Sequence, residues 1–410
     1  MKKKILHERF LVALIVGSSA IFSGCGGGGG GSNANSNPGT AVPTAPALSA
    51  AAALGEKIFA DKSLSASGQL ACNVCHDPVR AHAGNDNRAV PLGGVGMNVA
   101  GFRNAPSLNY LSFTPSFFFD SEGTPTGGFD RDGRVSTFAE QAQRPLLAAH
   151  EMANGTPAVF IAKLRSASYV AEFTQVFGAG IFDDGEAAFD RAVFALQQYE
   201  KESPEFRPFD SKYDYFLAGK AKLSDQELRG LALYNDPTKG NCAGCHPSSR
   251  LADGSPPLFT DFTYDNLGVP RNDDIPANAD PAYYDLGLCG PDRTDLQASH
   301  PDLCGAFKVP GLRNVGITAP YFHNGKFASL REVVSFYVRR DTNPDEWYPT
   351  KNDGSGGADK FNDLPPEYRG NVNITEVPYN RKIGDQPALT SDEIDAVVAF
   401  LNTLTDGYKL

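Results

Sequence analysis

Two C-x-x-C-H motifs, about 170 residues apart, constrain this chain more than any other feature of its 410 residues. Each motif supplies two thiols that can add to the vinyl groups of a haem and a histidine that can bind one axial face of the iron. A zinc site built from both cysteine pairs is the alternative, but structural zinc ligands usually lie much closer together in sequence. The motifs therefore predict two covalently bound haems c. Their residues are the attachment cysteines Cys72, Cys75, Cys242 and Cys245 and the iron ligands His76 and His246.

The N-terminus has the pattern of a secretory signal. Three lysines precede an apolar run from Phe10 to Phe22, which is too short for a comfortable membrane span, and small residues then lead to Cys25. Cys25 resembles the acylated cysteine of lipoproteins, although phenylalanine stands where those signals usually carry leucine. Gly26 after it favours the outer membrane. We expect residues 1–25 to be a lipoprotein-type signal segment and the protein to lie on the periplasmic side, lipid-anchored to the outer membrane.

Composition limits the partners and the number of domains. The formal net charge is −11, and removing residues 1–25, which carry three net positive charges, leaves −14. Such a surface disfavours nucleic acid and attracts basic proteins. Residues 26–50 are rich in Gly, Ser, Asn, Ala and Pro and are expected to form a flexible tether, so that the membrane is contacted only through the lipid. About 360 residues remain, enough for two domains.

An internal repeat predicts those two domains. The pattern Gly-x-x-x-aromatic-x-Asp begins at Gly55 before the first haem motif and at Gly230 before the second. Each repeat lies in a stretch with helical periodicity. Pro and charged residues interrupt the pattern near residues 203–208. We therefore expect an N-terminal haem domain over 51–203 and a C-terminal haem domain over 204–410.

Each domain is also expected to end in an amphipathic helix. These helices span residues 187–200 and 394–404, and the second begins at a capping box that starts with Thr390. Gly and Pro are frequent and strand-like alternation is sparse, so the sequence predicts an all-α protein of two cytochrome c-like domains with long loops. The remaining cysteines, Cys289 and Cys304, bracket a Pro- and Asp-rich loop, and an oxidising compartment makes a disulfide between them the default.

Beyond the haem motifs, a series of segments resembles the bacterial di-haem cytochrome c peroxidases, a family that includes the MauG-type enzymes. The resemblance begins near Leu54 and continues to the C-terminus. It implies that the N-terminal haem reacts with hydrogen peroxide and that the C-terminal haem relays electrons from a small cytochrome or cupredoxin. The matching segments are 103–109, 132–134, 140–142, 151–152, 266–270, 307–314 and 320–325.

The resemblance also assigns residues around the first iron. His76 becomes its proximal ligand, Glu151 the distal acid–base carboxylate and Gln141 the hydrogen-bonding neighbour of that carboxylate. Reduction of peroxide requires a proton to move from the inner to the outer oxygen, and a carboxylate near one face of the iron can move it. Without the resemblance, Glu151 would be read as an ordinary exposed helical charge.

The sequence does not determine which ligand, if any, lies on the opposite face of this iron. Many family members carry a distal histidine in the loop that here is residues 93–98, and this loop has none. Met97 is either a weak sulfur ligand or apolar lining over an open site, and we expect the open site. His82 is expected to be a solvated loop histidine. An open site predicts activity without prior reduction.

The second iron has His246 on one face, and the resemblance places Tyr337 on the other, where the peroxidases have methionine. A tyrosine ligand marks the MauG-type branch, and its phenolate lowers the reduction potential relative to methionine. The alternative is a core aromatic, since Val333, Val334 and Tyr337 form an ordinary helical stripe. Apart from Met1, the only methionines are Met97 and Met152.

Three further features follow from the resemblance. Asn104, Thr318 and Pro320 match a calcium site between the haems, where oxygen ligands, some from the backbone, suit a hard cation. His323 matches a motif position near the second haem and is expected to be a supporting hydrogen-bonding residue. Arg131 stands where family members commonly carry a tryptophan between the haems, which puts in doubt any shared oxidised state that needs that ring.

Three functions remain open on the sequence. The first is a cytochrome-c-peroxidase-type oxidoreductase that reduces hydrogen peroxide with electrons from a small redox protein. The second is a MauG-like enzyme that uses peroxide to oxidise an aromatic side chain of a partner protein. The third, a non-catalytic electron carrier, would need both irons saturated and would leave Glu151 and Gln141 without a role.

Overall fold

The structure is a computed structural model and describes residues 47–410. Helices and short 3₁₀ turns dominate, and the sheets within the described residues are pairs of two-residue antiparallel strands. The sequence-based predictions for residues 1–46, including the signal segment, Cys25 and most of the tether, lie outside the described residues. The helices are α1 (Ala50–Ala60), α2 (Cys72–Cys75), α3 (Phe138–Leu147), α4 (Pro157–Leu164), α5 (Val170–Phe177), α6 (Gly185–Glu202), α7 (Lys212–Leu217), α8 (Asp225–Asn235), α9 (Leu330–Arg339) and α10 (Ser391–Asn402). The strands are β1 (Leu92–Gly93), β2 (Val99–Ala100), β3 (Phe118–Phe119), β4 (Pro125–Thr126), β5 (Tyr264–Asp265) and β6 (Phe307–Lys308).

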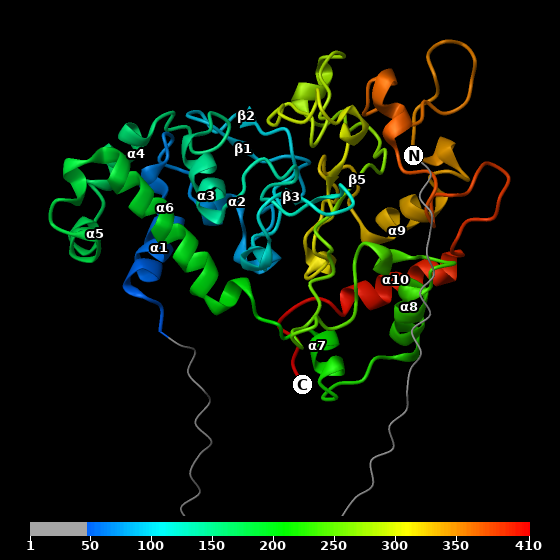
Figure 1. The fold of residues 1–410 in the computed structure, drawn as a ribbon, viewed down its shortest axis with the longest axis horizontal. Coiled ribbons are helices and arrows are strands. Elements are labelled where there is room, and N and C mark those ends of the chain that lie inside the picture. Colours follow the sequence, from blue (N-terminus) through cyan, green and yellow to red (C-terminus); the bar gives the residue numbers. More distant parts are fainter. Residues whose placement is uncertain (1–46) are drawn as a thin grey trace, which may run out of the picture. The chain divides into compact units, whose positions relative to one another are not determined.

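Helices α1 and α6 cross in the N-terminal half, where the sequence predicted a first and a last helix (Figure 1). The crossing point is Gly55. A Cβ at this position would lie 2.0 Å from the carbonyl oxygen of Ala195 on α6, so only glycine allows the two backbones to approach this closely. Helix α6 begins at the N-cap Asp184, whose side chain accepts hydrogen bonds from two backbone N–H groups of the first turn.

Helices α8 and α10 repeat this arrangement in the C-terminal half (Figure 1). Gly230 is the counterpart of Gly55, because a Cβ there would lie 1.9 Å from the carbonyl oxygen of Ala396. The predicted capping box is confirmed: the Thr390 side chain accepts from the Glu393 backbone, and the Glu393 side chain accepts from the Thr390 backbone. The repeated glycine of the sequence therefore marks a helix crossing in each half.

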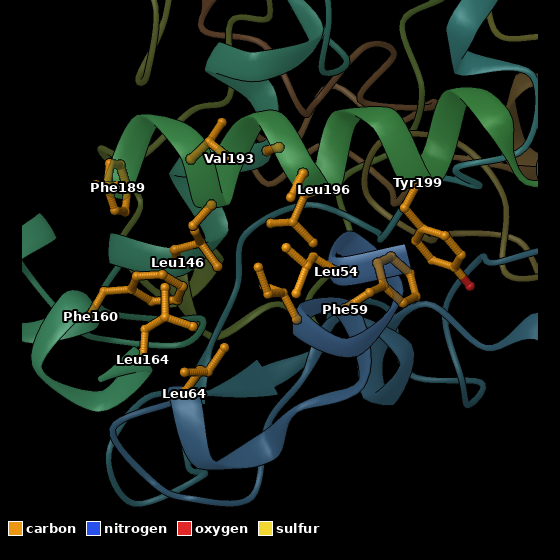
Figure 2. Close-up of a cluster of buried hydrophobic side chains, with 14 of the residues drawn as sticks. Leu54, Phe59, Leu64, Leu146, Phe160, Leu164, Phe189, Val193, Leu196 and Tyr199 are labelled. Atoms are coloured by element: carbon orange, nitrogen blue, oxygen red, sulfur yellow. The ribbon is translucent and has the colours of Figure 1, made fainter. Parts of the chain in front are cut away.

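Each crossing organises its own hydrophobic core. In the N-terminal half, Figure 2 shows side chains of α1 and α6 facing one another, and the Phe59 and Tyr199 rings meet edge to face with centroids 5.4 Å apart. In the C-terminal half, Tyr234 of α8 and Phe400 of α10 pack in the same manner, with centroids 5.1 Å apart. The region predicted as the domain boundary forms a short 3₁₀ turn, Pro204–Phe206, and the division at residue 203 stays a prediction.

Between the core helices the chain runs in long loops, as expected. These loops pack on the cores through aromatic side chains and through backbone hydrogen bonds to the helices and to one another. The structure joins Cys289 and Cys304 in a disulfide, with Cα atoms 5.0 Å apart. Within residues 47–410, no helix combines the length and apolar character that crossing a bilayer requires.

Candidate haem sites

The first C-x-x-C-H motif opens onto a cavity of about 520 Å³. Cys72, Cys75 and His76 line it, together with Gln141 and Glu151. Both thiols are free of disulfides. The volume is within the usual range of cofactor pockets, and the wall carries two free thiols and an imidazole. These features fit a covalently attached haem.

His76 is held in one orientation by the backbone. Its Nδ1 lies 2.9 Å from the carbonyl oxygen of His82, which accepts the ring N–H and leaves Nε2 as the metal-binding nitrogen. Burial lowers the pKa of His76 to about 4, so the ring is neutral and able to ligate at physiological pH. His82 itself is only 2% exposed and contacts the Asn109 amide oxygen at 2.8 Å through Nδ1. The expectation that His82 is solvated was therefore wrong, because its ring also packs against Phe206, with centroids 4.3 Å apart.

Glu151 lies in the turn that follows α3. Its backbone N–H donates to the Ala148 carbonyl at 3.0 Å, and its own carbonyl accepts from the Gly94 N–H at 2.9 Å. These contacts fix the backbone on two sides. Burial raises the pKa of the Glu151 carboxyl to about 7, and the nearby negative charge of Asp130 adds to the increase. The cavity therefore contains a carboxyl group that can both accept and donate a proton near neutral pH.

Met97 is not placed on the wall of this cavity. It lies in the turn between β1 and β2 and packs against the N-terminal hydrophobic core, while Val95 in the same turn is 68% exposed. The residues that line the wall near Glu151 include Phe102 and His150, whose ring centroids are 5.1 Å apart. Met97 therefore does not line the cavity, whereas Met152 does, and the open site stays a prediction.

A buried glutamate on α6 also lines this cavity and was not predicted from the sequence. Glu200 lies on α6, is only 5% exposed, and its Oε2 has no hydrogen-bond partner within the described residues. Burial raises its pKa to about 8, so the neutral acid is favoured at pH 7. Helical periodicity could have placed Glu200 on the inner face of α6, next to Leu196, but a glutamate there is ordinarily assigned to solvent.

The second motif lies on a larger cavity of about 550 Å³. Cys242 and Cys245 are free, and His246 Nδ1 lies 2.8 Å from the Phe259 carbonyl oxygen. This arrangement repeats the orientation of the first histidine, and burial lowers the pKa of His246 as well. The residues of this half therefore fit a second covalent haem.

Tyr337 of α9 lines the same cavity as His246. Its ring packs between Phe322 and Tyr379, each with a centroid 5.9 Å away. Burial raises the pKa of the Tyr337 phenol, and the nearby charge of Asp265 raises it further, so a phenolate here requires a cation beside it. Ferric iron held by His246 would supply that cation, which is consistent with ligation by Tyr337.

His323 also lines the second cavity. Its ring stacks on Phe307 with centroids 3.7 Å apart, and Nε2 lies 3.5 Å from the Asp363 carboxylate. The backbone carbonyl of His323 accepts from the Asn104 N–H at 2.7 Å. His323 therefore connects the second cavity, by a backbone hydrogen bond, to Asn104, which lines both cavities.

A few residues line both cavities, among them Gln141, Asn104 and Arg131. Lys308 lies beside them, and its backbone N–H donates to the Arg131 carbonyl at 2.8 Å. Burial lowers the pKa of Arg131 to about 10 and that of Lys308 to about 8. Within residues 47–410 neither cation forms an ion pair; Lys308 donates instead to the Gly128 carbonyl. Carboxylates of bound haems would be suitable counterions.

The residues expected to bind calcium do not fit the ion in this structure. Among the expected ligands, Asn104 offers a side-chain amide oxygen, and that oxygen accepts a hydrogen bond from Arg131 at 2.9 Å. Arg80 donates to the carbonyls of Ile317 and Ala319, which flank Thr318, so these two neighbouring oxygens are engaged as well. Thr318 and Pro320 do line the second cavity, as Asn104 does. Calcium requires six to eight oxygen ligands, so an engaged Asn104 removes the best of them.

Comparison with known proteins identifies the family. The family model described as di-haem cytochrome c peroxidase matches residues 49–222. The chain is 36% identical over 375 residues to the methylamine utilization protein MauG of Paracoccus denitrificans, covering 90% of this chain and 92% of that protein. The chain belongs to the di-haem cytochrome c peroxidase family.

Relatives from both branches of this family are similar to the chain. The cytochrome c551 peroxidase of Nitrosomonas europaea is 30% identical over 303 residues, covering 72% of this chain and 76% of that protein. The crystal structure of the diheme peroxidase BthA from Burkholderia thailandensis superimposes with a TM-score of 0.80 at 39% identity, covering 91% of this chain and 90% of that one. Membership of this family implies two haems c and an oxidoreductase activity.

Proposed function

We propose that this di-haem protein reduces hydrogen peroxide to water at the N-terminal haem site, with electrons relayed through the C-terminal haem from a small cytochrome or cupredoxin. The observation that carries the proposal is the Glu151 carboxyl, which lies in the same cavity as His76 and has a pKa raised to about 7.

Glu151 performs the proton transfer in this proposal. Haem bound through Cys72, Cys75 and His76 would supply an iron that binds peroxide and delivers electrons to the O–O bond. The Glu151 carboxylate accepts the proton of the inner oxygen and returns it to the outer oxygen, which leaves as water. The overall reaction consumes two electrons and two protons and forms two water molecules. Gln141, on α3 before that turn, lines the same cavity and would hold the Glu151 carboxylate or the peroxide by a hydrogen bond.

The second site supplies the electrons. Ligation of its iron by His246 and Tyr337 would saturate both faces, so that the iron exchanges electrons without binding peroxide. The negative charge of the chain favours a basic electron donor. Covalent haem attachment and the N-terminal pattern support a periplasmic location with a lipid anchor on Cys25.

A MauG-like modification of a partner protein is the second candidate. Two observations favour it: the Tyr337 position in the second cavity and the similarity to MauG over nine-tenths of the chain. Peroxide chemistry at His76 is shared by both candidates, and the difference lies in the source of the electrons. The third candidate, an electron carrier, is disfavoured because Met97 does not line the first cavity.

The test compares the wild-type holoprotein with Glu151→Gln in single-turnover reaction with hydrogen peroxide. Loss of the carboxylate is expected to slow the reaction by roughly 10²- to 10⁴-fold, the usual worth of a positioned acid–base group. Glu122→Gln is the matched control, because Glu122 is an exposed glutamate in the 120–124 turn. An unchanged rate in Glu151→Gln would remove the basis of the proposal.

The electron source is tested separately. The peroxide-treated wild-type protein is mixed with a reduced basic cytochrome c, and its oxidation is followed optically. Repeated turnover supports the peroxidase. Failure to oxidise the cytochrome, with oxidising equivalents retained for minutes, favours the MauG-like candidate.

A further inference from the structure

Arg131 binds the residue that a metal ion would use. Its Nη2 donates to the Asn104 side-chain oxygen at 2.9 Å, and its Nε donates to the Asn104 backbone oxygen at 3.0 Å. The guanidinium therefore uses both oxygens of this asparagine. No other side chain of the described residues donates to the Asn104 side-chain oxygen.

The position of Arg131 between the two cavities is unusual for a cation. It lines both cavities. The carboxylate that raises its pKa, Asp285, already forms a two-point ion pair with Arg103 at 2.6 and 2.7 Å. Arg103 and Arg131 repel one another, which adds to the cost of burying the charge. Asn104 is thus the fixed partner that holds Arg131 in place.

We propose that the Arg131 guanidinium occupies the cation site between the two haem cavities, so that this protein carries a covalently fixed positive charge where the family resemblance predicts an exchangeable calcium ion. Calcium and guanidinium both bind to oxygen lone pairs, and two positive charges on the same Asn104 oxygens in a buried site would repel one another. Arg80 donates to the carbonyls of Ile317 and Ala319, on either side of Thr318, and so places a second cation beside this region. The charge between the haems is then independent of the metal supply.

The experiment measures calcium binding by the haem-loaded protein and does not depend on peroxide activity. Wild-type protein is treated with EGTA, desalted and analysed for calcium by mass spectrometry, and calcium is then titrated calorimetrically. The wild type is expected to hold no stoichiometric calcium, and EGTA is expected to leave the haem EPR spectrum unchanged. Arg131→Gln frees the Asn104 oxygens and is expected to bind calcium at least about tenfold more tightly than the wild type.

Lys308→Met is the matched control, because it removes a neighbouring buried cation that does not bond Asn104. It is expected to bind calcium as the wild type does, and Arg131→Lys, which keeps the charge, is expected to do the same. Haem content, measured by absorbance, verifies that each variant has folded. About one calcium per wild-type protein, released by EGTA with a change in the haem EPR spectrum, would overturn the proposal. Equal calcium affinity in the wild type and Arg131→Gln would overturn it as well, since the guanidinium would then exclude nothing.

Discussion

The two halves of the molecule use one scaffold for two different cavities. Each half crosses a first and a last helix at a glycine, Gly55 or Gly230, and each points a histidine by donating Nδ1–H to a backbone carbonyl. The side chains that line the two cavities differ. Burial raises the pKa of two glutamates of the first cavity, Glu151 to about 7 and Glu200 to about 8, whereas the second cavity contains Tyr337 beside several carboxyl groups. The shared scaffold therefore fixes where the two cavities lie, and the proposed difference in function rests on these few side chains.

The largest expected effect on stability comes from the crossing glycines. Gly55→Ala and Gly230→Ala each place a Cβ about 2 Å from a backbone carbonyl, so each helix pair must separate. We expect each variant to lose about 3 kcal/mol or more of unfolding free energy, the upper end for overpacking. Gly185→Ala, at the start of α6, meets no atom within 4 Å and is the control. Chemical denaturation followed at the haem absorbance bands measures the loss. If only one of the two variants lost stability, the two glycines would not be structurally equivalent.

Tyr337→Met tests whether Tyr337 sets the reduction potential of the C-terminal haem. Replacing a phenolate by a thioether favours the ferrous state, and we expect the reduction potential of the C-terminal haem to rise by on the order of 0.1 V. Tyr379→Phe, which alters a neighbouring ring without removing Tyr337, is the control. Spectroelectrochemistry of both haems gives the answer. A potential that stays constant in Tyr337→Met would make Tyr337 a core aromatic.

The pH dependence of the reaction with peroxide should differ from that of electron transfer at the second cavity. The pKa of Glu151 is raised from its ordinary value of 4.5 to about 7, and the deprotonated form is the one that accepts the peroxide proton. The kcat/KM for peroxide should therefore fall about tenfold per pH unit as the pH drops below 7, and level off above it. In the Glu151→Gln variant, kcat/KM should no longer change around pH 7. Electron transfer at the Tyr337 site should be flat over the same range, and a rate that falls above pH 7 would contradict the assigned role.

The smallest effect concerns the capping boxes. Thr390→Ala removes the N-cap of α10, and we expect a loss of about 1 kcal/mol in unfolding free energy. Thr375→Ala, an exposed threonine without a capping role, should cost less than half of that. Denaturant titration of both variants measures the difference. Equal stability of the two variants would show that tertiary packing alone holds α10.

The features that sequence predicted are those that depend on local pattern. The haem motifs, the core helices and the Thr390 capping box follow from spacing over a few residues, and the repeated glycine pointed to two equivalent units. The missed features depend on contacts between distant segments. His82 is buried because its ring packs against Phe206, which lies far along the chain, and Arg131 reaches Asn104 across 27 positions of the chain. Glu200 shows the same limit, since only the tertiary structure turns that face of α6 toward a cavity.

The most direct measurement of the difference between the cavities is low-temperature EPR of the ferric protein, before and after one equivalent of hydrogen peroxide without reductant. An open iron at His76 and a saturated iron at His246 predict one high-spin and one low-spin signal, with the high-spin signal lost on addition of peroxide. Two low-spin signals that ignore peroxide until an electron is added would contradict this arrangement. They would mean that another ligand closes the first cavity.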